Sequence, residues 1–152
     1  DRTKTVDNVT YNVNAAGGDD RVAIGTSASN AGNTSIAIGK GAAIENDTDG
    51  SYQAVVKSDD IAIGTGAKTS ASDSSTAIGK SATVSQSTDA LAVGNGAQVS
   101  TSNHALAFGH GANAGSAAES IAMGTSAKTI SADTIAIGQS TSAEGANSVV
   151  IG

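Results

Sequence analysis

Short, mostly apolar triplets recur along the chain, with Ala in the middle of all but the last and Gly directly after each. Residues 36–38 (Ile-Ala-Ile) before Gly39 and residues 61–63 before Gly64 are typical copies. The nine copies end at Gly25, Gly39, Gly64, Gly79, Gly94, Gly109, Gly124, Gly138 and Gly152, at intervals of 14, 25, 15, 15, 15, 15, 14 and 14 residues. Such a period indicates one structural unit per repeat, stacked on its neighbours. It has room for two short strands and two tight turns, so we predict an all-β solenoid of about nine coils.

The second half of each repeat alternates apolar and polar residues. After Gly79, for example, Ala82 and Val84 are apolar and Thr83 between them is polar. Because neighbouring residues of a strand point to opposite faces, this pattern predicts a strand with an apolar inner face and a polar outer face.

The first strand of each repeat is apolar on both faces. Leu91 and Val93 point one way and Ala92 points the other. A strand buried on both faces needs cover on both, and its own coil supplies only one cover. We therefore expect another copy of the chain to supply the second, with the larger aliphatic residues inside the roll and the alanines toward the neighbouring copies. The predicted interface alanines are Ala37, Ala62, Ala77, Ala92, Ala107, Ala122 and Ala136.

Composition narrows the function classes. The 152 residues include only three aromatics, yet 38% are hydrophobic, so neither a conventional aromatic core nor wholesale disorder is expected. The net charge of −6 and the eight scattered Lys and Arg residues argue against nucleic-acid binding. With no cysteine, the chain has neither disulfides nor thiolate metal ligands.

A turn-forming position lies five residues before each repeat glycine. It is occupied by Asp20, Thr34, Asp59, Ser74, Asp89, His104, Glu119, Asp133 and Asn147. The last copy, residues 147–152, nearly spells Asn-Ser-Val-Ala-Ile-Gly, and in this the chain resembles the YadA-like heads of trimeric autotransporter adhesins. The resemblance covers about residues 20–152. The departures are Arg21, Ala90 and Ala105 in place of Ser, and Val150 in place of Ala.

The resemblance implies a left-handed parallel β-roll in an intertwined homotrimer. It also implies a stalk and an outer-membrane anchor outside this fragment, and therefore display at the bacterial cell surface. Heads of this kind look like non-catalytic binding devices for host cells or for extracellular matrix proteins such as collagen, fibronectin or laminin. No cofactor, metal or nucleic acid is implied.

Two stretches of the chain do not follow the repeat. Residues 1–20 carry no copy and are expected to be a cap or irregular lead-in to the head at 21–152, with a short strand suggested by the alternating residues of 9–13. The other is an insertion at about 45–58, where a turn at Asp49-Gly50 suggests a hairpin. Its Tyr52 and Lys57 are the candidate ligand contacts, with a tolerated insertion or a flap on a neighbouring chain as the alternatives.

The search for reactive chemistry is mostly negative. His104 occupies a turn position and His110 a variable position after Gly, and both are expected to be exposed rather than metal-bound. The acid pairs at 19–20 and 59–60 fall at turns, which is a sufficient role for them. Two other solenoid classes stay open as alternatives. A left-handed β-helix acyltransferase needs coils of about eighteen residues, and an ice-binding protein needs a regular array of Thr.

Overall fold

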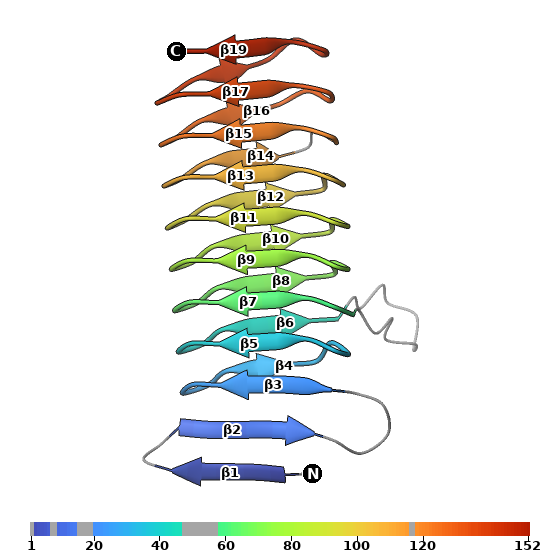
Figure 1. Cartoon of the computed structure of the whole chain (residues 1–152), viewed down its shortest axis with the longest axis vertical. Coiled ribbons are helices and arrows are strands. Elements are labelled where there is room, and N and C mark those ends of the chain that lie inside the picture. Colours follow the sequence, from blue (N-terminus) through green and yellow to red (C-terminus); the bar gives the residue numbers. More distant parts are fainter. Residues whose placement is uncertain (1, 7–8, 15–19, 47–57, 116–117) are drawn as a thin grey trace.

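The computed structural model describes residues 2–6, 9–14, 20–46, 58–115 and 118–152, with side chains from residue 20 onward. The described residues form strands and turns without a helix. Figure 1 shows the strands stacked along the long axis of the molecule, from β1 near the N-terminus to β19 at the other end. They belong to two sheets of eleven and eight strands, which we call sheet A and sheet B.

Sheet A contains the apolar triplets and the two N-terminal strands. Its members are β1 (Arg2–Val6), β2 (Val9–Asn14), β3 (Arg21–Ile24), β5 (Ile36–Ile38), β7 (Ile61–Ile63), β9 (Thr76–Ile78), β11 (Leu91–Val93), β13 (Leu106–Phe108), β15 (Ile121–Met123), β17 (Ile135–Ile137) and β19 (Val149–Ile151). Sheet B contains the second strand of each repeat. Its members are β4 (Ser29–Asn30), β6 (Ala43–Glu45), β8 (Lys68–Ser70), β10 (Thr83–Ser85), β12 (Gln98–Ser100), β14 (Asn113–Gly115), β16 (Lys128–Thr129) and β18 (Ser142–Ala143).

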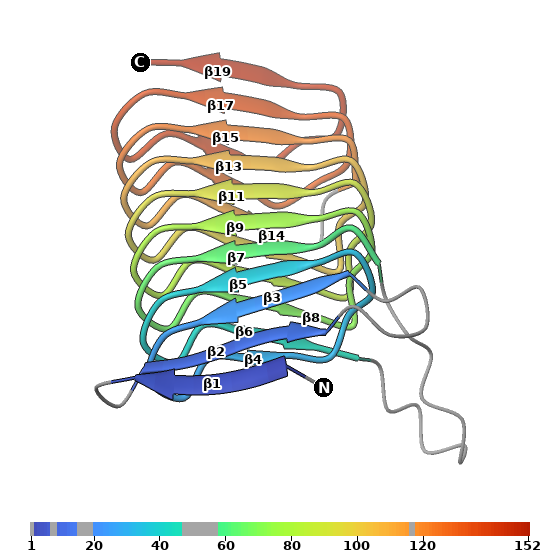
Figure 2. The same ribbon diagram turned by 60° about the horizontal axis from the view of Figure 1, so that its bottom comes forward.

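From β3 onward the chain alternates between the two sheets, so each repeat is one turn of a solenoid (Figure 2). The eight strands of sheet B correspond to eight complete turns, and β19 begins a ninth. Neighbouring turns pair in parallel and in register, as Leu91 does with Leu106 and Ile121 with Ile135. The prediction of a parallel solenoid is confirmed, with eight complete coils where nine copies of the triplet are present.

The turns explain why two positions of the repeat are restricted. The glycine that follows each strand of sheet A has a positive φ, +136° at Gly94, and stacks closely on the glycine of the next turn. Five residues before it the backbone is left-handed, with φ of 53° at Asp89 and 55° at His104. Short polar residues favour that conformation, so the predicted turn position is confirmed.

The interior is narrow and is filled mainly by small side chains. Ala92 of sheet A and Ala97 and Val99 of the opposite strand are all completely buried in one cluster. The inner apolar face predicted for the second strand is therefore confirmed.

The predicted assignment of faces in sheet A is wrong. The seven alanines proposed for the interface are all 0% exposed within a single chain, so they face the inside of the roll. They are Ala37, Ala62, Ala77, Ala92, Ala107, Ala122 and Ala136. The flanking aliphatic residues point outward instead. The reason is space: an interior already holding Ala97 and Val99 at close packing accepts a methyl group and has no room for two larger side chains.

The N-terminal strands extend sheet A beyond the first turn. β1 and β2 form an antiparallel hairpin, and β2 continues antiparallel to β3, with Tyr11 opposite Ile24. The strand predicted from the alternation at 9–13 is confirmed as part of β2. The hairpin covers the edge of sheet A, whereas sheet B ends at β4 in the described part of the chain.

The insertion does not interrupt the stacking of the turns around it. Ile38 pairs in register with Ile63, and the Asp59 amide donates to the carbonyl oxygen of Asn33 at 3.0 Å. Residues 47–57, with the predicted hairpin arm at 52–56 and the candidate contacts Tyr52 and Lys57, lie outside the described residues.

Candidate functional site

The outer face of sheet A is apolar along the length of the solenoid. We call this face the apolar stripe; it consists of two columns of side chains, one on each side of the buried alanines. Its members are Ile36, Ile38, Ile61, Ile63, Ile78, Leu91, Val93, Leu106, Phe108, Ile121, Met123, Ile135 and Ile137. All are half-buried or exposed, and Phe108 is 50% exposed.

The register of the sheet lines up the two columns of the stripe, and Thr76 is the one polar residue between Ile61 and Leu91. Leu91 stands between Thr76 and Leu106 in one column, and Val93 stands between Ile78 and Phe108 in the other. Because strands of one sheet lie about 4.8 Å apart, adjacent members of each column come close enough to contact. A long apolar patch of this kind marks an interaction surface in a soluble protein.

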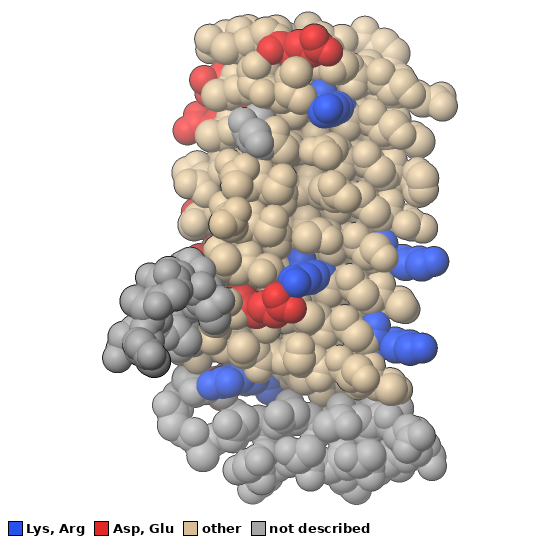
Figure 3. Space-filling model, turned by 180° about the vertical axis from the view of Figure 1, so that it is seen from behind, with Lys and Arg blue, Asp and Glu red and all other residues tan. Residues whose placement is uncertain are grey.

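The outer face of sheet B is polar, as predicted. Lys68, Gln98 and Lys128 point outward at every second level of the solenoid, and Lys68 forms an ion pair with Glu45 at 2.7 Å. Figure 3 shows this side of the molecule, where few charges are scattered over a mostly uncharged surface. We call it the polar wall. Exposed ion pairs of this type contribute little to stability.

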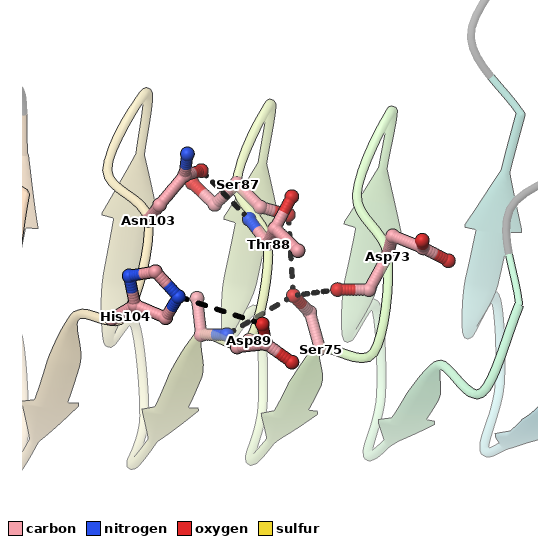
Figure 4. Close-up of polar contacts among 8 residues, drawn as sticks. Asp73, Ser75, Ser87, Thr88, Asp89, Asn103 and His104 are labelled. Carbon is pink, nitrogen blue, oxygen red and sulfur yellow. Dashed lines mark hydrogen bonds and ion pairs between the residues drawn. The ribbon is translucent and has the colours of Figure 1, made fainter.

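One corner of the interior holds a ladder of buried polar side chains. The Asp60 amide donates to Ser35 Oγ at 3.1 Å, the Ser75 amide to Asp60 Oδ1 at 2.9 Å, and the Ala90 amide to Ser75 Oγ at 3.2 Å. Figure 4 shows Ser75, whose hydroxyl donates to the carbonyl oxygen of Asp73 at 3.0 Å. The side chains provide acceptors for amides at the bend.

Asp60 has a role that the sequence prediction missed. A turn role was expected for both acids of the pair at 59–60, but only Asp59 is in the turn, whereas Asp60 is 1% exposed and faces the interior. The alternation of faces contained the signal. Asp60 occupies the same inward position in its repeat as Ser75 and Ala105 do in later repeats.

Both histidines are exposed, as predicted. His104 Nε2 lies 3.6 Å from Asp89 Oδ2, which belongs to the left-handed turn of the preceding coil (Figure 4). His110 stands at the opposite edge of sheet A. Within the described ranges, no group of three or more His, Cys, Asp or Glu side chains is arranged to hold a metal ion.

A shallow, open hollow lies at the N-terminal end of sheet B. Ser29 and Asn30 of β4 line it together with Ile44 and Glu45 of β6. Its one ionisable lining residue among those described is Glu45, which is paired with Lys68.

The described turns thus define a class: a parallel β-solenoid with one apolar side, one polar side and a small-residue core. No helical segment in the described ranges has the length and hydropathy needed to cross a membrane.

Parts of the solenoid match a known family. Residues 57–82, 72–97 and 130–152 match the YadA head domain repeat. These matches support a YadA-like head, a family that suggests an adhesin-type role of the kind found in trimeric autotransporters. A search of the curated proteins finds no match to the chain.

Proposed function

We propose that this chain is the head of a homotrimeric autotransporter adhesin, held at the bacterial surface by a stalk and outer-membrane anchor. In this assembly three left-handed rolls stand parallel around one axis, with their apolar stripes facing it. The observation that carries the proposal is the uncovered apolar stripe on a solenoid with YadA head repeats.

Burial of the stripe is the driving force for assembly. Each buried aliphatic side chain contributes about 1.5–3 kcal/mol when it is removed from water completely. Leu91, Phe108 and Ile121 are incompletely covered in one chain, so a second and third copy can bury area that the chain itself cannot. The hydrophobic centre of the molecule then lies between the chains as well as inside each coil.

Binding to the host uses the outward surfaces that remain after assembly. The polar wall is repeated three times around the trimer, and each repeat of a wall offers similar side chains such as Gln98 and Asn113. Weak contacts can add up because one particle presents them many times at high effective concentration. The proposed ligands are collagen, fibronectin, laminin or a receptor on host cells, and the proposed role is non-catalytic.

The two alternative solenoid classes have less support. Residues that pair between neighbouring coils are 14 or 15 positions apart in the sequence, whereas each coil of an acyltransferase needs about eighteen residues. The outward positions of sheet B include Lys68, Gln98 and Asn113, which do not form an array of Thr.

The assembly and the binding can be tested separately. Sedimentation equilibrium should give a mass three times that of the chain, and a stable monomer would contradict the trimer. Solid-phase binding of the fragment to collagens, fibronectin, laminin and fixed host cells should then give saturable binding to at least one of them. A panel with no binding above an albumin control would contradict the adhesin role of this fragment while leaving the assembly untouched.

A further inference from the structure

The two edges of the apolar stripe carry opposite charges. At the edge where the strands of sheet A begin, the left-handed turn residues of successive repeats form a column. This column carries the acids, and we call it the acidic edge. Its acids are Asp20, Asp59, Asp89, Glu119 and Asp133, all exposed, and the exposed His104 stands among them beside Asp89. The opposite edge, where the strands of sheet A end, is formed by the residues that follow the repeat glycines. We call it the basic edge. Its titratable members are Lys40, Lys80 and His110, all exposed, and it contains no acid.

Each edge is a regular column. On the acidic edge the amide of Asp89 donates to the carbonyl oxygen of Asp73 on the preceding turn at 3.0 Å. On the basic edge the amide of Gly96 donates to the carbonyl oxygen of Lys80 at 2.9 Å. Figure 3 shows the outcome from behind: basic side chains project at the right-hand margin, while acidic ones lie along the left-hand margin.

From the turn that ends at Gly25 to the turn that ends at Gly124, the charges also alternate along the axis. The acids at positions 20, 59, 89 and 119 belong to the turns that end at Gly25, Gly64, Gly94 and Gly124. The basic residues belong to the turns between them, which end at Gly39, Gly79 and Gly109. Turns are about 4.8 Å apart, so each basic residue stands one level from an acid above and an acid below.

Within the described part of the chain, neither Lys40 nor Lys80 forms an ion pair, because the acids lie across the full width of the sheet. A second copy changes this. When chains pack in parallel around an axis along the solenoid, the end of each strand of sheet A meets the beginning of the corresponding strand in the next chain. The basic edge of one copy then lies against the acidic edge of its neighbour.

We propose that this pairing of edges sets the orientation of the chains around the apolar stripe. The inference rests on the proposed trimer and adds the contacts that orient it. The occupant is a second copy of this chain, parallel to the first. An antiparallel partner, rotated about an axis along the strands, would bring acid against acid at one side, and like charges that meet at an interface select against it.

Charge exchange between the edges provides the test. The swapped chain carries Lys40→Glu and Lys80→Glu together with Asp59→Lys and Asp89→Lys. Around position 80, which lies between the levels of 59 and 89, it keeps complementary edges toward itself but presents like charges to the parent chain. Parent and swapped chains, distinguished by a mass tag, are unfolded together, refolded at low salt and examined by native mass spectrometry.

We expect the swapped and parent chains to form separate homotrimers. Differently tagged parent chains are the control and should give the binomial proportions of random mixing. Binomial mixing of swapped with parent chains would overturn the pairing of edges. A parent chain that stays monomeric would instead overturn the proposed trimer.

A second variant keeps the test decisive if the swapped chain fails to fold. Lys40→Glu with Lys80→Glu alters exposed residues alone, and should weaken the trimer about tenfold or more at low salt. Added salt should weaken the parent trimer and strengthen this variant, because screening removes attraction in one and repulsion in the other. Lys68→Glu with Lys128→Glu makes the same change in net charge on the polar wall and should leave assembly unchanged. Equal effects of the two pairs would overturn the proposal.

Discussion

A Cβ atom on Gly79 would lie 2.7 Å from the carbonyl carbon of Gly94 on the next turn. The two glycines stack at the end of sheet A, where Gly79 has a φ of +131°. Neither the backbone conformation nor the spacing between the turns leaves room for a side chain. The glycine of each repeat is therefore required by the distance between coils.

Gly79→Ala should destabilise the fold by about 2–5 kcal/mol, because strain at φ and overlap with the neighbouring backbone add together. Gly96→Ala is the matched control: its φ is +68° and no atom lies within 4 Å of the added Cβ. That substitution should cost about 1–2 kcal/mol, the ordinary penalty of the left-handed region. Denaturant unfolding measures both, and equal losses would contradict the role of the close stacking.

The two faces of one strand should respond differently to a charge. Ala92→Asp places a carboxylate in the closed interior, where burial costs several kcal/mol, so circular dichroism should show loss of β-structure. Leu91→Asp places it on the apolar stripe, so the turns should persist while sedimentation shows monomers. Gln98→Asp, on the polar wall, should change neither. An Ala92→Asp trimer as heat-resistant as the parent would contradict the inward face of the alanines.

The polar ladder of the interior should contribute measurably to stability. Ser75→Ala removes the acceptor of the Ala90 amide without disturbing the packing, because Ala90 and Ala105 already occupy the same column. We expect a loss of about 1–3 kcal/mol from the unsatisfied buried amide. Thr88→Ala, at an exposed position of the same corner, should have an effect close to zero. Thermal unfolding of both variants provides the measurement, and an unchanged Ser75→Ala protein would contradict this role.

Excision of residues 47–57 should leave the solenoid folded. The interval between Gly39 and Gly64 is 25 residues, and removal of 11 restores the ordinary 14. Ile38 and Ile63 already pair in register, so the shorter connection joins turns that are in place. Binding to the host ligand decides the role of Tyr52 and Lys57: lost binding with an intact trimer would assign the contact to the insertion, and undiminished binding would assign it to the polar wall.

The periodic sequence was sufficient to predict the sheets, and the reason is local. Each repeat contains its own strand pattern and its own turn residues, as at Asp89 and Gly94, so no long-range information was needed to place the turns. The strand at Val9–Asn14 followed from alternation in the same way.

Which face of sheet A is inside could not be predicted by this route. Alternation separates Ala92 from Leu91 and Val93, but both faces are apolar, so the pattern has no preference between them. The answer depends on the width of the coil, which is set by the side chains that meet Ala92 from sheet B. The opposite charges at Lys80 and Asp89 were visible in the sequence, yet their meaning required the two edges to be placed on either side of one face.

The parallel stacking of the turns has a mechanical consequence. The hydrogen bonds between turns point along the long axis (Figure 1), so tension between the ends of one solenoid loads successive turns in series. A turn that opens converts a rise of about 4.8 Å into an extended segment and lengthens the chain by about 45 Å. We therefore expect an isolated chain under a stretching force to yield in equal steps, one coil at a time, whereas neighbours joined along the apolar stripe share the load. Single-molecule pulling of monomeric and trimeric forms would reveal this as evenly spaced ruptures in the first and a higher yield force in the second.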